Sequence, residues 1–262
     1  MSVVKFFLTL GLLLFCSFAN AQNKVPNKDI RFIALGELHP WVPNGPNEHG
    51  IIKPKPIPKG AQPPNALRYS TGGETKPLRL PLLQFSPYAT FKGDDETLIL
   101  KNIATDGGGD FLKFPAPKEK VNLGVLFANH KTMSWTDPEI LMLKDDARSF
   151  PSGQIRFVNV SDRTVLVAIE GHSRFKLKAG ATSLKSLKDI GTFKGGKFIQ
   201  PTDGNAYIKL AFSDSKNKDQ NLLDNTLSIR KGERIQCFFY KSKGKGAAKE
   251  VKYLIVPEKI PK

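Results

Sequence analysis

Hydrophobic and polar residues alternate with a period of two over most of the chain beyond Leu67. The clearest run places four apolar residues on one face: Val121, Leu123, Val125 and Phe127. Further runs of the same kind cover 155–157, 165–169, 175–177, 207–212 and 251–255. Successive side chains of a strand point to opposite faces of a sheet, so this period predicts half-buried antiparallel strands.

Turn-forming residues separate these runs, as in Gly93-Asp94-Asp95 and Pro151-Ser152-Gly153. Strands at intervals of about 8–12 residues predict a sandwich or a barrel. Helical spacing is limited to 182–190, where an irregular strand fits equally well, and 140–143 reads as a strand. We therefore predict an all-β protein with an antiparallel, Ig-like β-sandwich. One continuous sandwich and two in tandem both remain open, because no internal repeat is visible in the sequence.

The chain divides into four predicted segments. These are a signal peptide (1–21), a proline-rich extended segment (22–66), a β domain (67–148) and a β-sandwich domain (149–262). The second segment is expected to pack poorly, as polyproline II or coil lying over a domain, because proline fixes φ and lacks an amide donor. A short strand over 30–35 is expected to precede its prolines.

The first 21 residues have the layout of an export signal. Lys5 precedes an apolar run over 6–18, and Ala19-Asn20-Ala21 offers small residues for cleavage before Gln22. The run is shorter than the about 20 apolar residues of a membrane span, although an uncleaved N-terminal anchor is the alternative. We therefore predict a periplasmic or secreted protein, and the sequence does not separate these two locations.

The cysteines and the charge bear on stability and partners. Cys16 leaves with the signal peptide, so Cys237 stands alone and is expected to be a buried core thiol. The formal net charge of the 262 residues is +16, with lysine more frequent than arginine. A basic exported protein is attracted to anionic envelope components such as lipopolysaccharide, acidic polysaccharide or lipid head groups. We do not expect nucleic acid as the partner.

Two basic stretches, 174–197 and 241–252, are the strongest candidate binding feature. If they share a face, they form an anion-binding surface. The candidate residues are Arg174, Lys176, Lys178, Lys185, Lys188, Lys243 and Lys245. The alternative is a lysine-rich surface that only keeps the protein in solution.

No catalytic or metal-binding motif is apparent, and we expect no cofactor. Glu37, His39, Glu48 and His49 lie close together in sequence, but their spacing matches no metal motif and the segment is rich in proline. The acidic pair Asp145-Asp146 is expected to form a solvated turn, because neighbouring strand residues point to opposite faces.

The segment Phe150–Ser161 has a proline-glycine turn followed by a strand that ends near Asn159, and a hairpin return follows over 163–171. In these features it resembles a set of uncharacterised exported bacterial β-sandwich proteins. The resemblance implies a β-sandwich and export, and it carries no activity with it.

We interpret the chain as a non-catalytic binding or structural module at the cell envelope. One alternative is a hydrolase with dispersed catalytic residues, for which a pocket that joins His39, His49 or His130 to acids would be the mark. Another is an assembly subunit whose proline-rich arm pairs with the edge of a neighbour's sheet. The ligand and the oligomeric state are not determined by the sequence.

Overall fold

The fold is known from a computed structural model, which describes residues 25–103, 109–169, 174–186, 192–194, 197–199, 205–213, 219–228, 232–243 and 250–260. The predicted signal peptide lies outside these residues. All regular elements that the described residues form are β-strands. The prediction of an all-β sandwich protein is therefore confirmed. The segment 140–143 forms a strand as predicted. The segment 182–186, for which a helix and an irregular strand were both open, also forms a strand.

Two four-stranded sheets form the first half of the protein. Sheet A has the order β10-β9-β1-β6 and sheet C the order β5-β4-β7-β8. Their strands are β1 (Lys28–Leu35), β4 (Ala66–Thr71), β5 (Glu74–Arg79), β6 (Ala89–Phe91), β7 (Thr97–Asn102), β8 (Asp110–Pro115), β9 (Val121–Phe127) and β10 (Glu139–Lys144). Phe32, Phe91 and Leu98 are fully buried in the core between the two sheets.

Two further four-stranded sheets form the second half. Sheet D has the order β14-β11-β19-β20 and sheet E the order β13-β12-β17-β18. Their strands are β11 (Gln154–Val160), β12 (Val165–Ile169), β13 (Phe175–Leu177), β14 (Thr182–Ser186), β17 (Asn205–Ser213), β18 (Asp219–Ser228), β19 (Glu233–Lys241) and β20 (Val251–Lys259). Phe157, Phe212 and Phe239 lie in the core between these sheets.

The two halves have the same topology, which the sequence did not reveal. Replacing β1 and β4–β10 in order by β11–β14 and β17–β20 converts sheet A into sheet D and sheet C into sheet E. In both halves the first strand pairs in parallel with the penultimate one, and its other neighbour is antiparallel. Both halves also have a register shift between the equivalent strands β7–β8 and β17–β18. The protein is therefore a tandem pair of sandwiches, and the tripeptide Ile-Arg-Phe recurs at equivalent places, 30–32 and 155–157.

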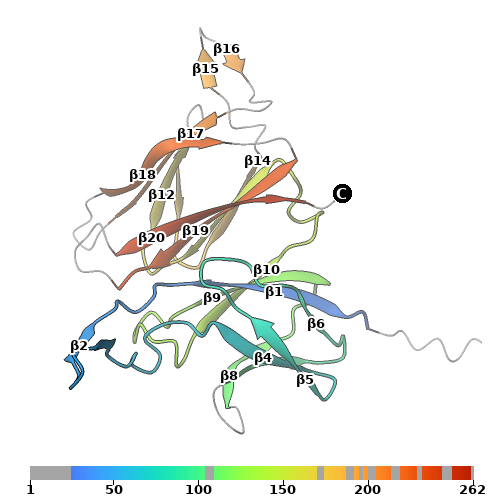
Figure 1. The fold of residues 1–262 in the computed structure, drawn as a ribbon. Coiled ribbons are helices and arrows are strands. Elements are labelled where there is room, and N and C mark those ends of the chain that lie inside the picture. The colour runs from blue at the N-terminus through green and yellow to red at the C-terminus, as the bar shows by residue number, and fades with distance from the viewer. Residues whose placement is uncertain are drawn as a thin grey trace, which may run out of the picture.

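The halves stack through their first sheets, so that sheets A and D pack face to face (Figure 1). Ile33 and Val125 from sheet A join Val158 and Phe238 from sheet D in this third core. The central strands β1, β9, β11 and β19 are consequently buried on both faces, and the prediction of half-buried strands is wrong for the two of them that it covered, β9 and β11. The prediction of antiparallel pairing also fails for β1–β9 and β11–β19, because alternation reports which faces are buried and not the direction of the neighbouring strand.

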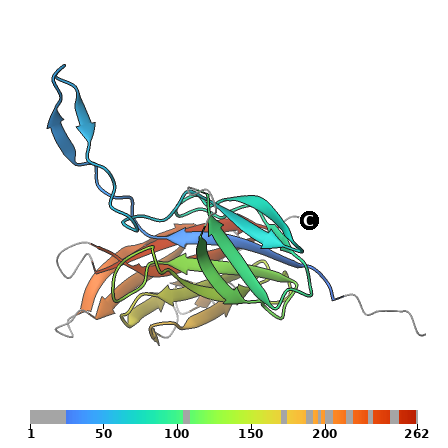
Figure 2. The ribbon, with the colours of Figure 1, turned by 90° about the horizontal axis from the view of Figure 1, so that it is seen from below.

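The predicted extended segment 22–66 has two different parts. Lys28–Leu35 is not poorly packed, because it is strand β1 in the middle of sheet A and its last six residues are buried. The proline-rich part instead forms a small ribbon of β2 (Pro43–Pro46) and β3 (Ile52–Pro54), all exposed. This ribbon projects from the sandwiches (Figure 2). A second ribbon, β15 (Thr192–Lys194) with β16 (Lys197–Ile199), is inserted in the other half.

Cys237 lies on β19 in the core between sheets D and E, and burial raises the pKa of its thiol above the usual range. The reactive thiolate is therefore suppressed at neutral pH. We expect a Cys16→Ser chain to show no reaction with a thiol reagent while folded and one thiol after denaturation. Rapid labelling of the folded chain would contradict the burial of Cys237.

Candidate functional site

A groove of about 520 Å³ lies on the outer face of sheet E, the face turned away from the core. The strand register builds its floor, because Leu166 on β12 pairs with Ala211 on β17, and Ala168 pairs with Lys209. On β12 the floor residues alternate with Val165, Val167 and Ile169, and on β17 they alternate with Ile208, Leu210 and Phe212. These six residues point into the core. The outer face is therefore a row of short aliphatic side chains with polar groups at its sides.

Basic residues line the groove from two strands that are far apart in sequence. Arg174 and Lys176 come from the β13 side, where Lys176 pairs with Leu166. Lys209 comes from β17, and its ammonium lies 3.3 Å from the carboxylate of Asp224 on β18. Both groups of this pair are about half exposed, so the pair is weak and leaves the groove positive.

The structure brings together only part of the predicted basic set. Arg174 and Lys176 line the groove. Lys185 does not line it, because its ammonium lies 4.9 Å from the centre of the Phe175 ring, which packs against the core between sheets D and E. Lys178 is exposed in the turn after β13, outside the groove lining.

The predicted residues of the second basic stretch do not join this groove. Lys243 follows β19 and donates a hydrogen bond to the carbonyl of Ala61 in the first half at 2.6 Å. Lys188 and Lys245 lie outside the described residues. The described residues therefore do not form a single face that carries both basic stretches.

Lys209 was missed as a site residue, although its strand was predicted. The alternation of 207–212 places Lys209 on the face opposite to Ile208 and Leu210. The sequence pattern does not show which residue lies next to Lys209 in the sheet, because its partner Ala168 is 41 positions away along the chain. The groove is thus a product of strand pairing.

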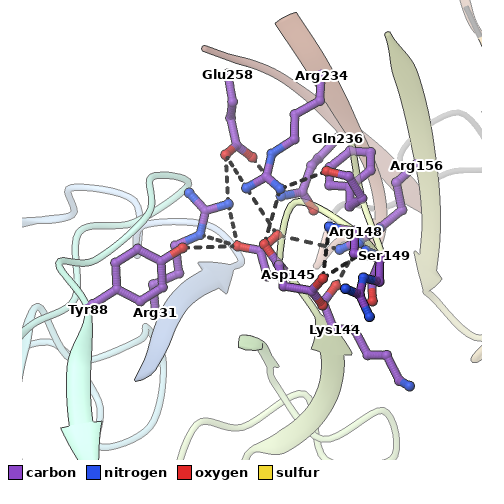
Figure 3. Close-up of polar contacts among 12 residues, drawn as sticks. Arg31, Tyr88, Lys144, Asp145, Arg148, Ser149, Arg156, Arg234, Gln236 and Glu258 are labelled. Carbon is purple, nitrogen blue, oxygen red and sulfur yellow. Dashed lines mark hydrogen bonds and ion pairs between the residues drawn. The ribbon is translucent and has the colours of Figure 1, made fainter. Parts of the chain in front are cut away.

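A buried charged cluster lies at one end of the interface between sheets A and D (Figure 3). Along each contributing strand the residues that face this interface alternate, as in Arg31, Ile33 and Leu35 on β1. The same alternation runs through the other strands, so the charged residues continue the apolar rows. The cluster comprises Arg31, Asp145, Arg156, Arg234 and Glu258.

Asp145 is the centre of the cluster, and its side chain has an exposed fraction of 0%. Arg31 lies 2.7 Å from this carboxylate and 2.7 Å from that of Glu258. Arg234 lies 3.3 Å from Asp145 and 3.2 Å from Glu258. Arg31 of the first half thus bridges to Glu258 on β20, the last strand of the second half. The cluster therefore fixes the two sandwiches to each other.

Arg156 is the least well compensated arginine of the cluster. Its guanidinium is 3.7 Å from Asp145, donates to the carbonyl of Lys144 at 2.7 Å, and lies 4.0 Å from the centre of the Phe150 ring. Burial lowers the pKa of Arg156 to about 10, although Asp145 acts in the opposite direction. The residue remains protonated at neutral pH. Three arginines against two carboxylates then leave the cluster with one excess positive charge.

The cluster corrects one prediction and extends the topological repeat. Asp145 is buried and does not belong to a solvated turn, whereas Asp146 accepts hydrogen bonds from the backbone amides of Arg148 and Ser149. When the two Ile-Arg-Phe tripeptides are aligned, the register places Asp145 on the equivalent position to Glu258. An arginine inside an otherwise apolar strand was the available signal for this cluster in the sequence.

A small cavity at the opposite end of the interface contains the histidine and acid that the hydrolase hypothesis requires. His130 and Glu37 line it together with Tyr240, but its volume is about 10 Å³. Such a space holds about one water molecule, and it does not admit a substrate. Burial, with a contribution from Glu37, raises the pKa of Tyr240 to about 12, so its phenol is neutral at physiological pH.

The carboxylate of Glu37 is held by Ser242, whose hydroxyl donates to it at 2.8 Å, and by Lys252 at 2.6 Å. His49 contacts Glu48 at the exposed end of the β2–β3 ribbon instead. Within the part of the chain that the structure describes, no three His, Cys, Asp or Glu side chains are grouped as a metal site would require.

No protein-family model matches this chain, and no curated protein matches it in sequence. A solved structure named "putative cell adhesion protein", from Bacteroides eggerthii, is similar over 90% of this chain and 97% of its own. The identity is 9% and the TM-score is 0.20, values too low to support an argument about function. The described residues contain no helix with the length and apolar character of a membrane span.

Proposed function

We propose that this protein is a non-catalytic binding module of the cell envelope, and that its groove on sheet E binds anionic envelope components. The observation that carries the proposal is the convergence of Arg174, Lys176 and Lys209 on one groove with an aliphatic floor. The cations attract carboxylate or phosphate groups, and the floor accommodates the apolar faces of sugars or chains. The export signal predicted for 1–21 and the net charge of +16 support the same role.

The test is retention on an immobilised acidic polysaccharide in a salt gradient, with lipopolysaccharide and anionic lipid vesicles as parallel arms. We expect Arg174→Ser with Lys176→Ser to weaken binding about tenfold or more at low salt, because each cation near an anionic surface contributes about 1 kcal/mol. The arm with the largest loss identifies the source of the anionic group. Equal binding by the variant and the parent protein in all three arms would contradict the proposal.

The matched control is Lys118→Ser with Lys120→Ser. These two lysines are exposed, are also two residues apart, and lie in the first half before β9. The control removes the same charge from the protein, so it isolates the groove from the overall net charge. Asp224→Asn should have the opposite effect, a gain in affinity of a few fold, because it frees Lys209 from its partner.

The proposed location has a separate test in the native host. Envelope fractions washed with rising salt should release the protein only at high salt if charge holds it there. A protein found in the soluble fraction at every salt concentration would contradict the envelope location, whatever the groove binds in solution.

A further inference from the structure

The proline-rich arm, residues 38–59, is the part of the surface that neither the groove nor the interface explains. The ribbon β2–β3 closes through Asn47, whose side-chain oxygen accepts the amides of His49 and Ile51 at 3.0 and 2.9 Å. Its base is held by the amide of Trp135, which donates to the carbonyl of Gly60 at 2.9 Å. The arm is therefore a formed element that extends from the body of the protein (Figure 2).

The arm exposes large apolar side chains. Leu38 and Trp41 have exposed fractions of 68% and 64%, while Ile51, Ile52 and Ile57 lie between 51% and 54%. Five of the nine exposed large hydrophobic residues of the described chain thus fall within these 22 positions. Apolar side chains concentrated on one projecting element mark an interaction surface.

The charges of the arm indicate the kind of partner. Lys53 follows Ile52 directly, and Lys55 and Lys59 lie on either side of Ile57. Glu48 is the only acid of the segment. Lysine carries its ammonium on a long aliphatic stem, so the charge can lie at a polar boundary while the stem remains in apolar surroundings. Tryptophan favours the same boundary between hydrocarbon and water. The combination is complementary to an anionic lipid surface.

The backbone of the arm argues against pairing with a protein sheet. Six prolines occupy the segment, and Pro43, Pro46 and Pro54 lie in the two strands themselves. Each proline lacks the amide that an added strand would bond, and prolines on an edge are a device that prevents such pairing. The arm therefore offers side chains rather than a free hydrogen-bonding edge.

We propose that the arm inserts its apolar side chains into the interface of an anionic lipid bilayer. This contact is additional to the groove and does not depend on it. The groove binds through cations over a rigid floor, whereas the arm buries Trp41 and the isoleucines among head groups and acyl chains. The two sites together hold the protein at a surface through two independent elements.

Tryptophan fluorescence gives a direct test, because the chain has two tryptophans and the other, Trp135, is already buried with 3% exposed. We expect the emission of the purified protein to shift to the blue on addition of phosphatidylcholine vesicles that contain phosphatidylglycerol. Pure phosphatidylcholine should give a smaller shift at equal lipid. Ile51→Ser with Ile52→Ser should weaken partitioning about tenfold or more, because less apolar area is buried.

The control is Leu184→Ser, which removes a residue with an exposed fraction of 42% outside the arm and should leave partitioning unchanged. Arg174→Ser with Lys176→Ser should retain the blue shift, so failure of the arm and failure of the groove are distinguishable. An unshifted emission would overturn the proposal. So would association between copies that the isoleucine variant abolishes without lipid, which would instead identify the arm as a protein-assembly element.

Discussion

Asp145→Asn is expected to lower the free energy of unfolding by about 3–5 kcal/mol. The substitution preserves shape but removes the negative charge on which Arg31, Arg156 and Arg234 converge. Glu258 then remains as the one carboxylate for three buried arginines. An uncompensated buried charge costs far more than the net gain that the intact pair provides.

The measurement is denaturant unfolding of both proteins, followed by fluorescence. Glu74→Gln is the control, because Glu74 pairs with Lys76 at 3.2 Å on an exposed surface and should lose no more than about 1 kcal/mol. A loss for Asp145→Asn no larger than that of the control would mean that the cluster does not join the two halves energetically.

Phe238→Ala is expected to cost about 3–5 kcal/mol and to separate the unfolding of the two halves. Phe238 is fully buried between sheets A and D, where its ring lies 6.4 Å from that of Phe85 in the first half. Truncation leaves a cavity in the surface through which the sandwiches contact each other. The coupling between them weakens, while each half keeps its own core.

Phe239→Ala is the matched comparison, one residue further along β19. Its side chain is also fully buried but faces sheet E, inside the second half. We expect a similar total loss with a single transition for Phe239→Ala, because the interface is intact. Calorimetry should resolve two transitions only for Phe238→Ala. Identical single transitions for both variants would show that the interface is not what couples the halves.

The sequence predicted the elements of this protein well, because strand alternation is a local property. The runs at 121–127, 155–157 and 165–169 form strands, and most of their predicted inward-facing residues, such as Leu123, Phe157 and Val167, lie in a core. The prolines of the arm excluded helix and central strand correctly, since the absence of an amide donor is a property of the residue itself. The all-β class followed from these patterns together.

The candidate site was predicted only in part, for a physical reason. Arg174 and Lys176 are two residues apart, so their strand alone places them on one face. Lys209 joins them because β12 lies between β13 and β17, and that order is set by long-range packing. Lys243 carries the same positive charge, but it does not lie in the groove, because it donates a hydrogen bond to the carbonyl of Ala61 in the first half.

By itself, the sequence determined most of the strands, the absence of helix from the proline-rich segment and the excess of positive charge, because each depends on neighbouring residues or on composition. Only the tertiary structure decided that the chain repeats one topology twice and buries Asp145 among three arginines. These features arise where strands far apart in sequence share a sheet or an interface. The free energy of burying a charge there depends on both strands together and not on either local sequence. A solvated acid and a buried one can therefore have the same local sequence.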